Sequence, residues 1–472
     1  MLNQDSIRRL LIISHDVVDA AMAGPGIRYW EIARILAQHC SVTLLVPNQC
    51  TLRTTAFIIQ TYQMDDWNSL RRAAEQADII MPCGFILAVF PQLAQLGLPI
   101  VIDGYDPYPI EALALAGRWD HARQTASQQS VERQLQLECT HADFILCASE
   151  RQRFWWLGML MIHGRLNVAT YGADPTLRNL IDVVPFGCES TLPQHTRQVM
   201  KGVMPGIQHN DKVLLWGGGI WDWLDPLTLI RVMPKIIARH PNIRLVFPGT
   251  RHPNAHVPEM AMRQKAVDMA NGLGLLNTHV FFGDWVPYAD WQNYLLEADA
   301  GVSLHITSLE TQLAFRSRIL DYIRAGLPMV VNQGDITSEV VERYQLGLVV
   351  DCGDDQATAD AILTLLQEPR EARRDQFLLA QADFAWERIL EPLARFCRHP
   401  YKAADAGRTL KEMPSQPDSV SAADSVSAEG IKERDAEIAR LRGLVRGYES
   451  GRFIRFMRWL HGRREHTSGS GK

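Results

Sequence analysis

The chain has 472 residues, which is too long for one hydrophobic core, so we expect two domains with additional segments. Apolar residues make up 47% of it and charged residues 21%, and the net charge of −5 provides no field for nucleic acid, so no nucleic-acid partner is expected. The 8 cysteines are scattered without metal-ligand spacing, which favours reduced thiols and a cytoplasmic protein. No apolar run reaches the roughly 18 residues of a membrane span, so any membrane contact would be peripheral.

Short apolar runs alternate with longer amphipathic stretches over the first part of the chain. The first helix is predicted at residues 28–38, and strands are predicted at residues 10–13, 42–46, 79–80, 100–102 and 144–146. Apolar strands separated by helices are typical of a parallel sheet that is covered on both faces. We therefore predict a first Rossmann-like domain over residues 1–190.

The same pattern restarts after a polar, proline-containing break at residues 189–211. Further strands are predicted at residues 213–216, 245–247, 280–282, 300–304, 329–331 and 348–350. This second array predicts a Rossmann-like domain over residues 212–383, and a helix over residues 384–400 would cross back to the first domain. The predicted fold class is α/β, with two doubly wound Rossmann-like domains that face a cleft.

The composition changes after residue 400. Residues 401–430 are rich in Ala, Ser, Asp and Pro, which predicts a disordered linker. Residues 431–464 are predicted to form a basic amphipathic helical tail, in which residues 452–464 mix aromatic side chains with arginines. That segment could dock on an anionic bilayer at the inner face of the membrane, pair as a helix with itself or another protein, or remain disordered.

Glycine-rich turns follow the first strand of each array. Glycine lets the backbone approach a ligand closely, and a helix N-terminus offers free N–H groups to a phosphate. We expect Gly24, Gly26, Gly218 and Gly219 to line a phosphate or sugar path, although ordinary strand-to-helix turns could use the same residues. The first turn lacks the G-x-G-x-x-G spacing and the later acidic residue of a dinucleotide site, so no nicotinamide site is expected.

The most informative segment is residues 310–328, which begins with Glu310, contains Arg316, Arg318 and Asp321, and ends in Ala-Gly-Leu-Pro. Together with the string GPGIRYWEIARILA around the first helix, it resembles retaining glycosyltransferases of family 4, also described as glycosyl transferases group 1. The resemblance implies the GT-B fold. It also implies an enzyme of polysaccharide or O-antigen biosynthesis that moves a sugar from a nucleotide diphosphate sugar to a glycan or lipid-linked acceptor.

The resemblance also implies roles for individual residues. Glu310 would contact the transferred sugar, and Arg318 and Arg316 would offset the charge of the leaving diphosphate. Asp321 would hold the ribose, whose hydroxyls can both donate hydrogen bonds to one carboxylate. The reaction would retain the anomeric configuration and would need no metal ion, no cofactor and no protein nucleophile. The arginines could instead be solvated surface cations, and Asp321 a charge that stabilises a helix N-terminus.

Other donor-side candidates lie on predicted turns. Thr250 and Arg251 follow a predicted strand, and open α/β sheets bind ligands at the carboxyl ends of their strands. In the family, the turn that here holds Trp285 and Val286 contacts the nucleotide base, although an aromatic side chain at a strand end could belong to the core. Ser317 precedes the candidate cation where related sequences have a Ser-Lys pair.

The first domain would hold the acceptor. Asp103 and Asp106 follow one of its predicted strands, and their carboxylates could bind acceptor hydroxyls or cap the next helix.

Two features depart from the family pattern. Glu310 and Asp321 are farther apart than the family's acidic pair, and the lysine that often follows the turn at residues 217–219 is missing. Because this lysine is missing, a second function stays open, namely that of a non-catalytic protein that binds a nucleotide sugar or glycan within an assembly. A nucleotide-sugar epimerase or a phosphorylase on the same fold are further alternatives.

Overall fold

The structure is a computed structural model in which residues 7–407 are described. The predicted tail at residues 431–464, and all of the predicted linker except residues 401–407, lie outside the described residues. We call residues 7–188 the first half and residues 189–385 the second half. No described helix is both long enough and apolar enough to cross a membrane.

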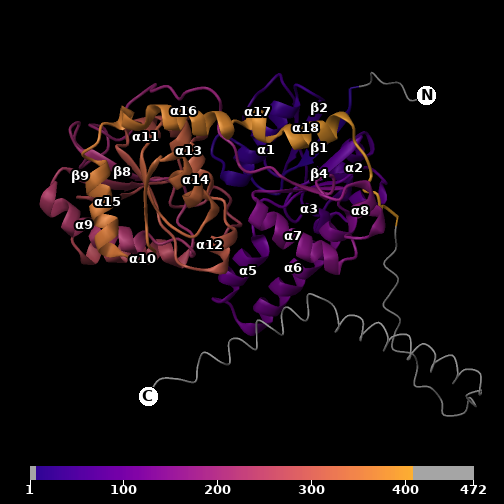
Figure 1. Cartoon of the computed structure of the whole chain (residues 1–472), viewed down its shortest axis with the longest axis horizontal. Helices are drawn as coiled ribbons and strands as arrows, with labels where there is room; N and C mark the ends of the chain where they lie inside the picture. Colours follow the sequence, from indigo (N-terminus) through magenta and orange to yellow (C-terminus); the bar gives the residue numbers. More distant parts are fainter. Residues whose placement is uncertain (1–6, 408–472) are drawn as a thin grey trace, which may run out of the picture. The chain divides into compact units, whose positions relative to one another are not determined.

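The first half is built on seven parallel strands (Figure 1). These are β1 (Arg9–Ile13), β2 (Ser41–Val46), β3 (Ile58–Thr61), β4 (Ile79–Pro82), β5 (Val101–Asp103), β6 (Phe144–Cys147) and β7 (Ile181–Val183). Their order is β3-β2-β1-β4, and a bridge between Ile80 and Ile100 continues it to a second group ordered β5-β6-β7. The sequence pattern did not predict β3, because this edge strand exposes most of its side chains and lacks an apolar run, and it did not predict β7.

The second half contains one parallel sheet with the order β10-β9-β8-β11-β12-β13. Its strands are β8 (Lys212–Trp216), β9 (Ile243–Phe247), β10 (Val280–Phe282), β11 (Ala300–Ser303), β12 (Met329–Asn332) and β13 (Gly347–Val350). The strand order reverses between β8 and β11, as it does between β1 and β4 in the first half. Open α/β sheets bind ligands beyond the carboxyl ends of the strands at such a reversal.

Hydrophobic cores cover both faces of each sheet. In β1, Leu10 and Ile12 belong to one buried cluster, whereas Leu11 and Ile13 belong to the cluster on the opposite face. The side chains of β8 divide between two clusters in the same way. Successive side chains of a strand point to opposite faces, so a strand buried on both faces must be apolar throughout, as the sequence predicted.

Eight helices of the first half accompany its strands. They are α1 (Gly24–Leu36), α2 (Trp67–Glu75), α3 (Ile86–Val89), α4 (Gln92–Gln95), α5 (Tyr108–Ala116), α6 (His121–His141), α7 (Glu150–Ile162) and α8 (Val168–Ala173). α1 begins earlier than predicted, because Pro25 falls in its first turn, where the missing N–H would have no helical partner. The helix therefore starts at the glycine-rich turn itself.

The helices of the second half are α9 (Pro226–Arg239), α10 (Ala261–Gly272), α11 (Tyr288–Glu297), α12 (Leu309–Leu313), α13 (Ser317–Ala325), α14 (Ile336–Tyr344), α15 (Asp355–Leu365), the 3-10 helix η1 (Arg370–Arg373) and α16 (Arg374–Asp383). The start of α13 at Ser317 places Arg318 in its first turn and Asp321 one turn later. The helix ends at Gly326 in the left-handed conformation, with φ of 58°, which glycine adopts without steric cost.

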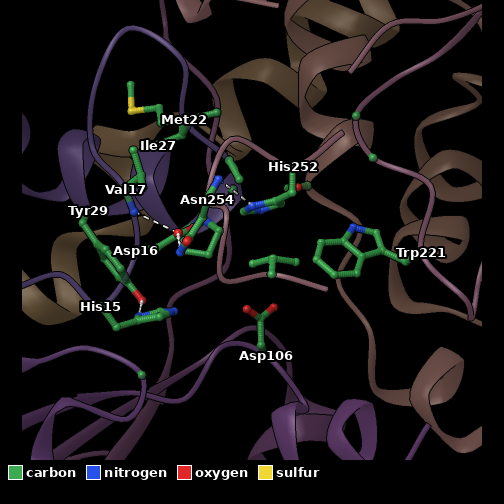
Figure 2. Close-up of a pocket in the computed structure, with 18 of the residues that line it drawn as sticks. His15, Asp16, Val17, Met22, Ile27, Tyr29, Asp106, Trp221, His252 and Asn254 are labelled. Atoms are coloured by element: carbon green, nitrogen blue, oxygen red, sulfur yellow. Dashed lines mark hydrogen bonds between the residues drawn. The ribbon is translucent and has the colours of Figure 1, made fainter. Parts of the chain in front are cut away.

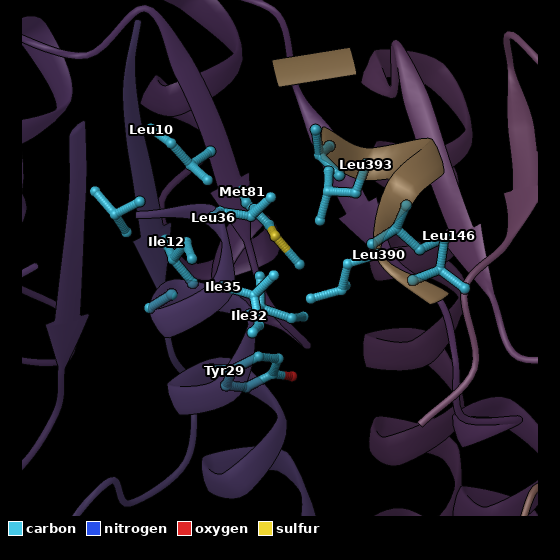
Figure 3. Close-up of a cluster of buried hydrophobic side chains, with 14 of the residues drawn as sticks. Leu10, Ile12, Tyr29, Ile32, Ile35, Leu36, Met81, Leu146, Leu390 and Leu393 are labelled. Atoms are coloured by element: carbon cyan, nitrogen blue, oxygen red, sulfur yellow. The ribbon is translucent and has the colours of Figure 1, made fainter. Parts of the chain in front are cut away.

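The chain then crosses back to the first half in two helices, α17 (Trp386–Ile389) and α18 (Glu391–Arg398). The sequence predicted one helix here, but Pro392 lies in the first turn of α18, and a proline inside a continuous helix would clash with the preceding turn. Leu390 and Leu393 pack beside Leu146 and Met81 in the first-half core (Figure 3).

Residues 401–407, the start of the predicted disordered linker, are held against the first half. Lys402 Nζ lies 2.8 Å from Asp143 Oδ2, and Asp405 Oδ2 lies 2.8 Å from Arg165 Nε. These ion pairs give this stretch the specific contacts that its composition alone does not predict.

Candidate active site

A cavity of about 1030 Å³ lies between the carboxyl ends of the two sheets and is lined by both halves. The first half contributes the turns after β1, β4 and β5, and the second half contributes the turns after β8, β9 and β10 together with the first turns of α13. In Figure 2, His15 and Asp106 of the first half lie across from Trp221 and His252 of the second half. Both strand-order reversals therefore open into the same space.

The turn after β1 bonds directly to the second half. Asn254 Nδ2 donates to Asp16 Oδ1 at 2.7 Å (Figure 2), and Trp285 Nε1 donates to the carbonyl of Met22 at 3.1 Å. These bonds connect the two walls of the cavity along one edge. The cavity is therefore bounded by contacts that would have to break for the two halves to separate.

Arg318 is the cation that the structure places most favourably for an anionic ligand. Its side chain lines the cavity, although the residue is only 8% exposed. Nη2 donates to the carbonyl of Gly219 at 3.0 Å, whereas Nη1 is buried and has no hydrogen-bond partner among the described residues. Burial lowers the Arg318 pKa to about 10, so the group is still charged at neutral pH. A buried charged donor without a partner is costly, and an anion in the cavity would satisfy it.

The glycine turn after β8 lies against this arginine. Gly218 has a φ of +77°, which glycine adopts without strain, and a Cβ placed on it would be 4.0 Å from Arg318 Nη2. The N–H of Gly217 donates to the Tyr322 hydroxyl at 2.7 Å. Gly218 and Gly219 both line the cavity.

The two predicted glycines of the first half differ in position. Gly24 lines the cavity, and a Cβ on it would be 3.9 Å from Ser317 Oγ of the second half. Gly26 does not line the cavity. It lies in the first turn of α1, where a Cβ would be 2.2 Å from the carbonyl oxygen of Val17. The structure therefore gives Gly26 a packing role in place of the predicted ligand contact.

Asp321 lines the cavity one helical turn after Arg318. Its Oδ2 accepts a hydrogen bond from Trp291 Nε1 at 2.9 Å. Burial raises the Asp321 pKa to about 6, and the neighbouring Glu189 carboxylate adds to the rise. The carboxyl keeps acceptor positions beyond the Trp291 bond, because an ionised carboxylate accepts about four hydrogen bonds.

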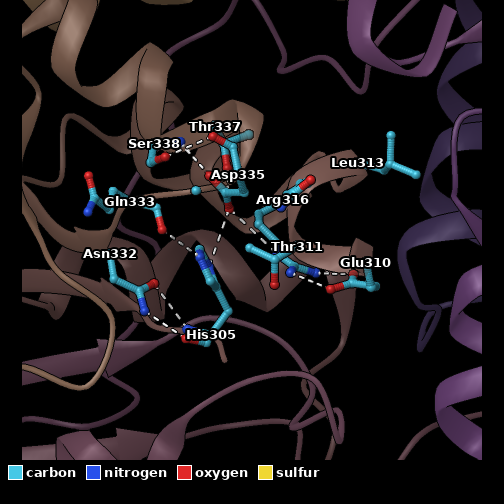
Figure 4. Close-up of polar contacts among 12 residues, drawn as sticks. His305, Glu310, Thr311, Leu313, Arg316, Asn332, Gln333, Asp335, Thr337 and Ser338 are labelled. Carbon is cyan, nitrogen blue, oxygen red and sulfur yellow. Dashed lines mark hydrogen bonds and ion pairs between the residues drawn. The ribbon is translucent and has the colours of Figure 1, made fainter. Parts of the chain in front are cut away.

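Glu310 and Arg316 form a buried ion pair (Figure 4). Two guanidinium nitrogens of Arg316 donate to the two Glu310 oxygens at 2.6 and 2.8 Å, and Arg316 Nε lies 3.6 Å from Asp335 Oδ2. Arg316 lines the cavity, whereas the Glu310 side chain is 2% exposed and does not. These two predicted site residues therefore bind each other. Because Glu310 and Asp335 already balance much of the Arg316 charge, Arg318 is the less compensated cation.

The remaining donor-side candidates divide between two cavities. Trp285 and Val286 line the large cavity. Thr250 and Arg251 instead line a neighbouring cavity of about 260 Å³, to which Trp285 also contributes. The Thr250 hydroxyl donates to the carbonyl of Gly283 at 2.9 Å, and this hydrogen bond stabilises the turn after β10. Thr250 and Arg251 are therefore not in the wall that holds Arg318.

The two acceptor candidates have different surroundings. The Asp103 side chain is fully buried, and both of its oxygens accept hydrogen bonds from Arg28 at 2.8 Å. Arg28 also donates to the carbonyls of Val184 and Pro185. The structure thus corrects the prediction that Asp103 binds acceptor hydroxyls, because its carboxylate is committed to this ion pair. Asp106, in contrast, points into the cavity (Figure 2).

The sequence analysis missed Glu111, Trp221 and Asn254, which also line the cavity. Glu111 lies in the first turn of α5, where an acidic residue is ordinarily explained by the helix dipole. The sequence feature that could have indicated Glu111 as a site residue is its position shortly after the turn that contains Asp103 and Asp106. Among the described residues, no three His, Cys, Asp or Glu side chains are grouped so that they could hold a metal ion.

Comparisons with known proteins agree with this arrangement. Residues 205–377 match the family model described as Glycosyl transferases group 1. Spore coat protein SA of Bacillus subtilis (strain 168) is 25% identical over 214 residues, which are 42% of this chain and 52% of that protein. The chain thus matches about half the length of this curated relative.

Several solved structures share the fold at low sequence identity. Sucrose-phosphate synthase (tll1590) from Thermosynechococcus elongatus has a TM-score of 0.54 at 14% identity, covering 83% of this chain and 98% of that chain. Anabaena Alr3699/HepE in complex with UDP-glucose has a TM-score of 0.57 at 14% identity (82% and 99%). WaaG, a glycosyltransferase involved in lipopolysaccharide biosynthesis, has a TM-score of 0.56 at 13% identity (82% and 99%).

The fold of the described residues is therefore GT-B, as the sequence predicted. Residues 205–377, which match the glycosyl transferases group 1 model, include the glycine turn after β8 and the helix with Arg318 and Asp321.

Proposed function

We propose that this chain is a glycosyltransferase that moves a sugar from a nucleotide diphosphate sugar to a hydroxyl of a glycan or lipid-linked acceptor. The observation that carries the proposal is Arg318, which lines the cavity beside the glycine turn and whose buried Nη1 has no hydrogen-bond partner among the described residues. The cavity of about 1030 Å³ is at the upper end of the roughly 300–1,000 Å³ of small-molecule sites. HepE, a protein of the same fold, was solved in complex with UDP-glucose, which supports the donor class.

Each wall would supply a separate part of the reaction. As the bond between the sugar C1 and the diphosphate oxygen breaks, negative charge grows on the diphosphate, and Arg318 would stabilise that charge. The acceptor oxygen forms the new bond to C1 on the same face, and its proton passes to the leaving diphosphate, so the anomeric configuration is retained. This step uses no protein nucleophile, and we propose that it needs no metal ion and no cofactor. The contacts between Asp16 and Asn254 would help to keep water out of the closed cavity.

A panel of nucleotide diphosphate sugars tests this proposal. Purified protein is incubated with each donor, and release of the nucleoside diphosphate is measured with and without candidate glycan acceptors. Turnover of at least one donor is expected. Binding without any turnover would instead support a non-catalytic protein of an assembly, and conversion of the donor sugar without release of nucleotide would indicate an epimerase.

Asp321 gives the proposed nucleotide site a pH dependence. Because the Asp321 pKa is raised to about 6, its carboxylate becomes protonated below that pH and accepts fewer hydrogen bonds from the ribose. At one pH unit below this pKa about a tenth of the sites are ionised, so the affinity for UDP is expected to fall about tenfold between pH 8 and pH 5. Calorimetric titration with UDP measures the change. Asp321→Asn is the control that corrects for titration of the nucleotide, and an equal fall in that variant would contradict the role.

We also propose that the protein acts in the cytoplasm and docks on an anionic bilayer. Residues 452–464, outside the described part, combine arginines with aromatic side chains. On α7, Phe154, Met161 and Ile162 recur at helical spacing and are 69%, 62% and 84% exposed. The described chain ends close to this helix, because Asp405 is bound to Arg165, which follows α7.

Vesicle flotation of the full chain tests this docking. Binding that requires anionic lipid is expected, and Phe154→Ser with Ile162→Ser should weaken it. Leu192→Ser, at an exposed apolar position elsewhere, is the matched control. Equal flotation with neutral vesicles would rule out the charge-dependent mode.

A further inference from the structure

A tyrosine on the same helix as Arg318 is bonded to the glycine turn after β8. Tyr322 is fully buried and, unlike Arg318, does not line the cavity. Its hydroxyl accepts a hydrogen bond from the N–H of Gly217 at 2.7 Å. The same hydroxyl lies 3.0 Å from the carbonyl oxygen of Leu215 and 3.2 Å from that of Val302. One side chain of α13 is therefore bonded to the first residue of the turn and to the two neighbouring strands, β8 and β11.

Glycine at two positions gives the Tyr322 side chain its space. A Cβ on Gly301, inside β11, would be 2.7 Å from the Tyr322 ring, and a Cβ on Gly217 would be 3.0 Å from its hydroxyl oxygen. Glycine inside a strand weakens the strand and often marks the close approach of another group. Here that group is the Tyr322 ring, which the two glycines allow to reach the ends of β8 and β11.

The protonation of Tyr322 fits these contacts. Burial raises the Tyr322 pKa to about 12, so the hydroxyl keeps its proton at neutral pH. It can therefore donate to a strand carbonyl while it accepts from Gly217. Without the hydroxyl, the buried Gly217 N–H would lose its partner, and the turn would lose its bond to α13 at this end.

Arg318 is bonded to the other end of the same turn. Its Nη2 donates to the carbonyl of Gly219 at 3.0 Å, and its guanidinium carbon lies 5.1 Å from the centre of the Trp216 ring. Residues four apart on a helix share a face, so Arg318 and Tyr322 reach the turn from the same side of α13. The helix thus binds the turn at both ends, and Gly218 between them has a φ of +77°.

We propose that Tyr322 is a positioning residue for the transfer: it fixes the glycine turn and, through the Gly219 carbonyl, the direction of Arg318. The inference rests on the proposed transferase function and adds to it a residue that touches no substrate. Among the described residues, the Arg318 guanidinium donates one hydrogen bond, which is the bond from Nη2 to this turn. A shift of the turn would move the charge relative to the leaving diphosphate, and a charge stabilises a transition state best when it is already in place.

A double-mutant cycle tests whether Tyr322 acts through Arg318. Tyr322→Phe removes the hydroxyl and keeps the ring, and it is expected to lower kcat about tenfold, because a small displacement of an oriented group is costly in rate. In the Arg318→Ala background the same substitution should lower kcat less than about twofold, because the group that the tyrosine positions is gone. An unchanged kcat in Tyr322→Phe, or a tenfold loss in both backgrounds, would refute the proposal.

Tyr344→Phe is the matched control. The Tyr344 hydroxyl, on α14, donates to the carboxylate of Asp383, and Tyr344 does not line the cavity. Each variant loses one tyrosine hydroxyl bond, so both melting temperatures are expected to fall by only a few degrees. Only Tyr322→Phe should lower kcat. A similar loss of kcat in Tyr344→Phe would attribute the effect to a weakened second half and contradict the positioning role.

Binding of UDP separates failure of this inference from failure of the proposed function. Calorimetric titration of the four proteins of the cycle measures UDP affinity even if no donor is turned over. UDP carries the charge of the leaving diphosphate, so Tyr322→Phe is expected to weaken its binding about fivefold, and to leave it unchanged in the Arg318→Ala background.

Each combination of results has one meaning. Turnover by the wild type with additive effects in the cycle would refute the role of Tyr322 alone. Coupled effects on UDP binding without turnover of any donor would support the role of Tyr322 and contradict the transferase function alone. Inorganic pyrophosphate is a second probe that needs no recognition of a base, and absence of binding for both UDP and pyrophosphate would refute both.

Discussion

Replacing Arg318 by alanine is expected to lower turnover about 100-fold, which corresponds to roughly 3 kcal/mol of lost stabilisation of the leaving diphosphate. The reason is geometric: Arg318 has a buried donor nitrogen without a partner among the described residues, whereas Arg316 is balanced by Glu310. The loss should fall mainly on kcat, because negative charge on the diphosphate grows as the sugar bond breaks. Steady-state kinetics with the identified donor provide the measurement.

Two further variants make this result specific. Arg239→Ala removes an exposed arginine at the end of α9 and should leave turnover unaffected. Arg318→Lys keeps the charge but loses the planar set of donors, and it is expected to restore only part of the rate. The melting temperature of each variant shows whether the fold is intact. Turnover at the wild-type level in Arg318→Ala would remove this arginine from the site and with it the main support for the proposed function.

Replacing Asp103 by alanine is expected to reduce the free energy of unfolding by about 3–5 kcal/mol, because Arg28 would remain buried without its partner. Both side chains of the pair are 0% exposed, so water cannot compensate the guanidinium. Denaturant titration followed by circular dichroism compares the variant with the wild type. This outcome separates the two roles considered for Asp103, since an acceptor ligand would affect transfer and leave stability nearly unchanged.

Two control variants accompany Asp103→Ala, one in the Arg28 and Asp103 pair and one at the neighbouring Asp106. Arg28→Met combined with Asp103→Leu removes both charges and should recover much of the lost stability, because an apolar pair needs no compensation. Asp106→Ala should change stability by only about 0.5 kcal/mol, because its carboxyl, unlike that of Asp103, forms no ion pair with a described residue. A stable Asp103→Ala protein would show that the buried pair contributes less than its geometry indicates.

The sequence predicted much of the fold because the signals for it are local. Strands buried on both faces must be apolar throughout, so β1, β8 and β10 were recognisable as short apolar runs. β3 exposes most of its side chains and left no such run. The break between α17 and α18 depends on the position of Pro392 within the helix rather than on apolar spacing, so the prediction of a single helix there was wrong.

The candidate site was predictable where its residues are neighbours in the chain. The Gly218 and Gly219 turn follows a strand directly, and Arg318 and Asp321 lie one helical turn apart. Spacing along the chain therefore places the members of each pair together, whereas the contact between the two pairs, in which Arg318 Nη2 donates to the Gly219 carbonyl at 3.0 Å, is a tertiary one. Spacing also does not show that Thr250 and Arg251 line the neighbouring cavity instead, since that depends on how the turns after β9 and β10 pack.

The sequence by itself determined the two α/β arrays, their glycine turns and the charged helix that faces the ligand space, because each is encoded within one or two turns of chain. The tertiary structure alone decided which charges are free. Asp103 is neutralised by Arg28, 75 residues away, and Arg318 keeps an unpartnered nitrogen. Whether a charged group binds the protein or a ligand depends on which groups folding brings within hydrogen-bond distance, and residues remote in sequence supply those groups.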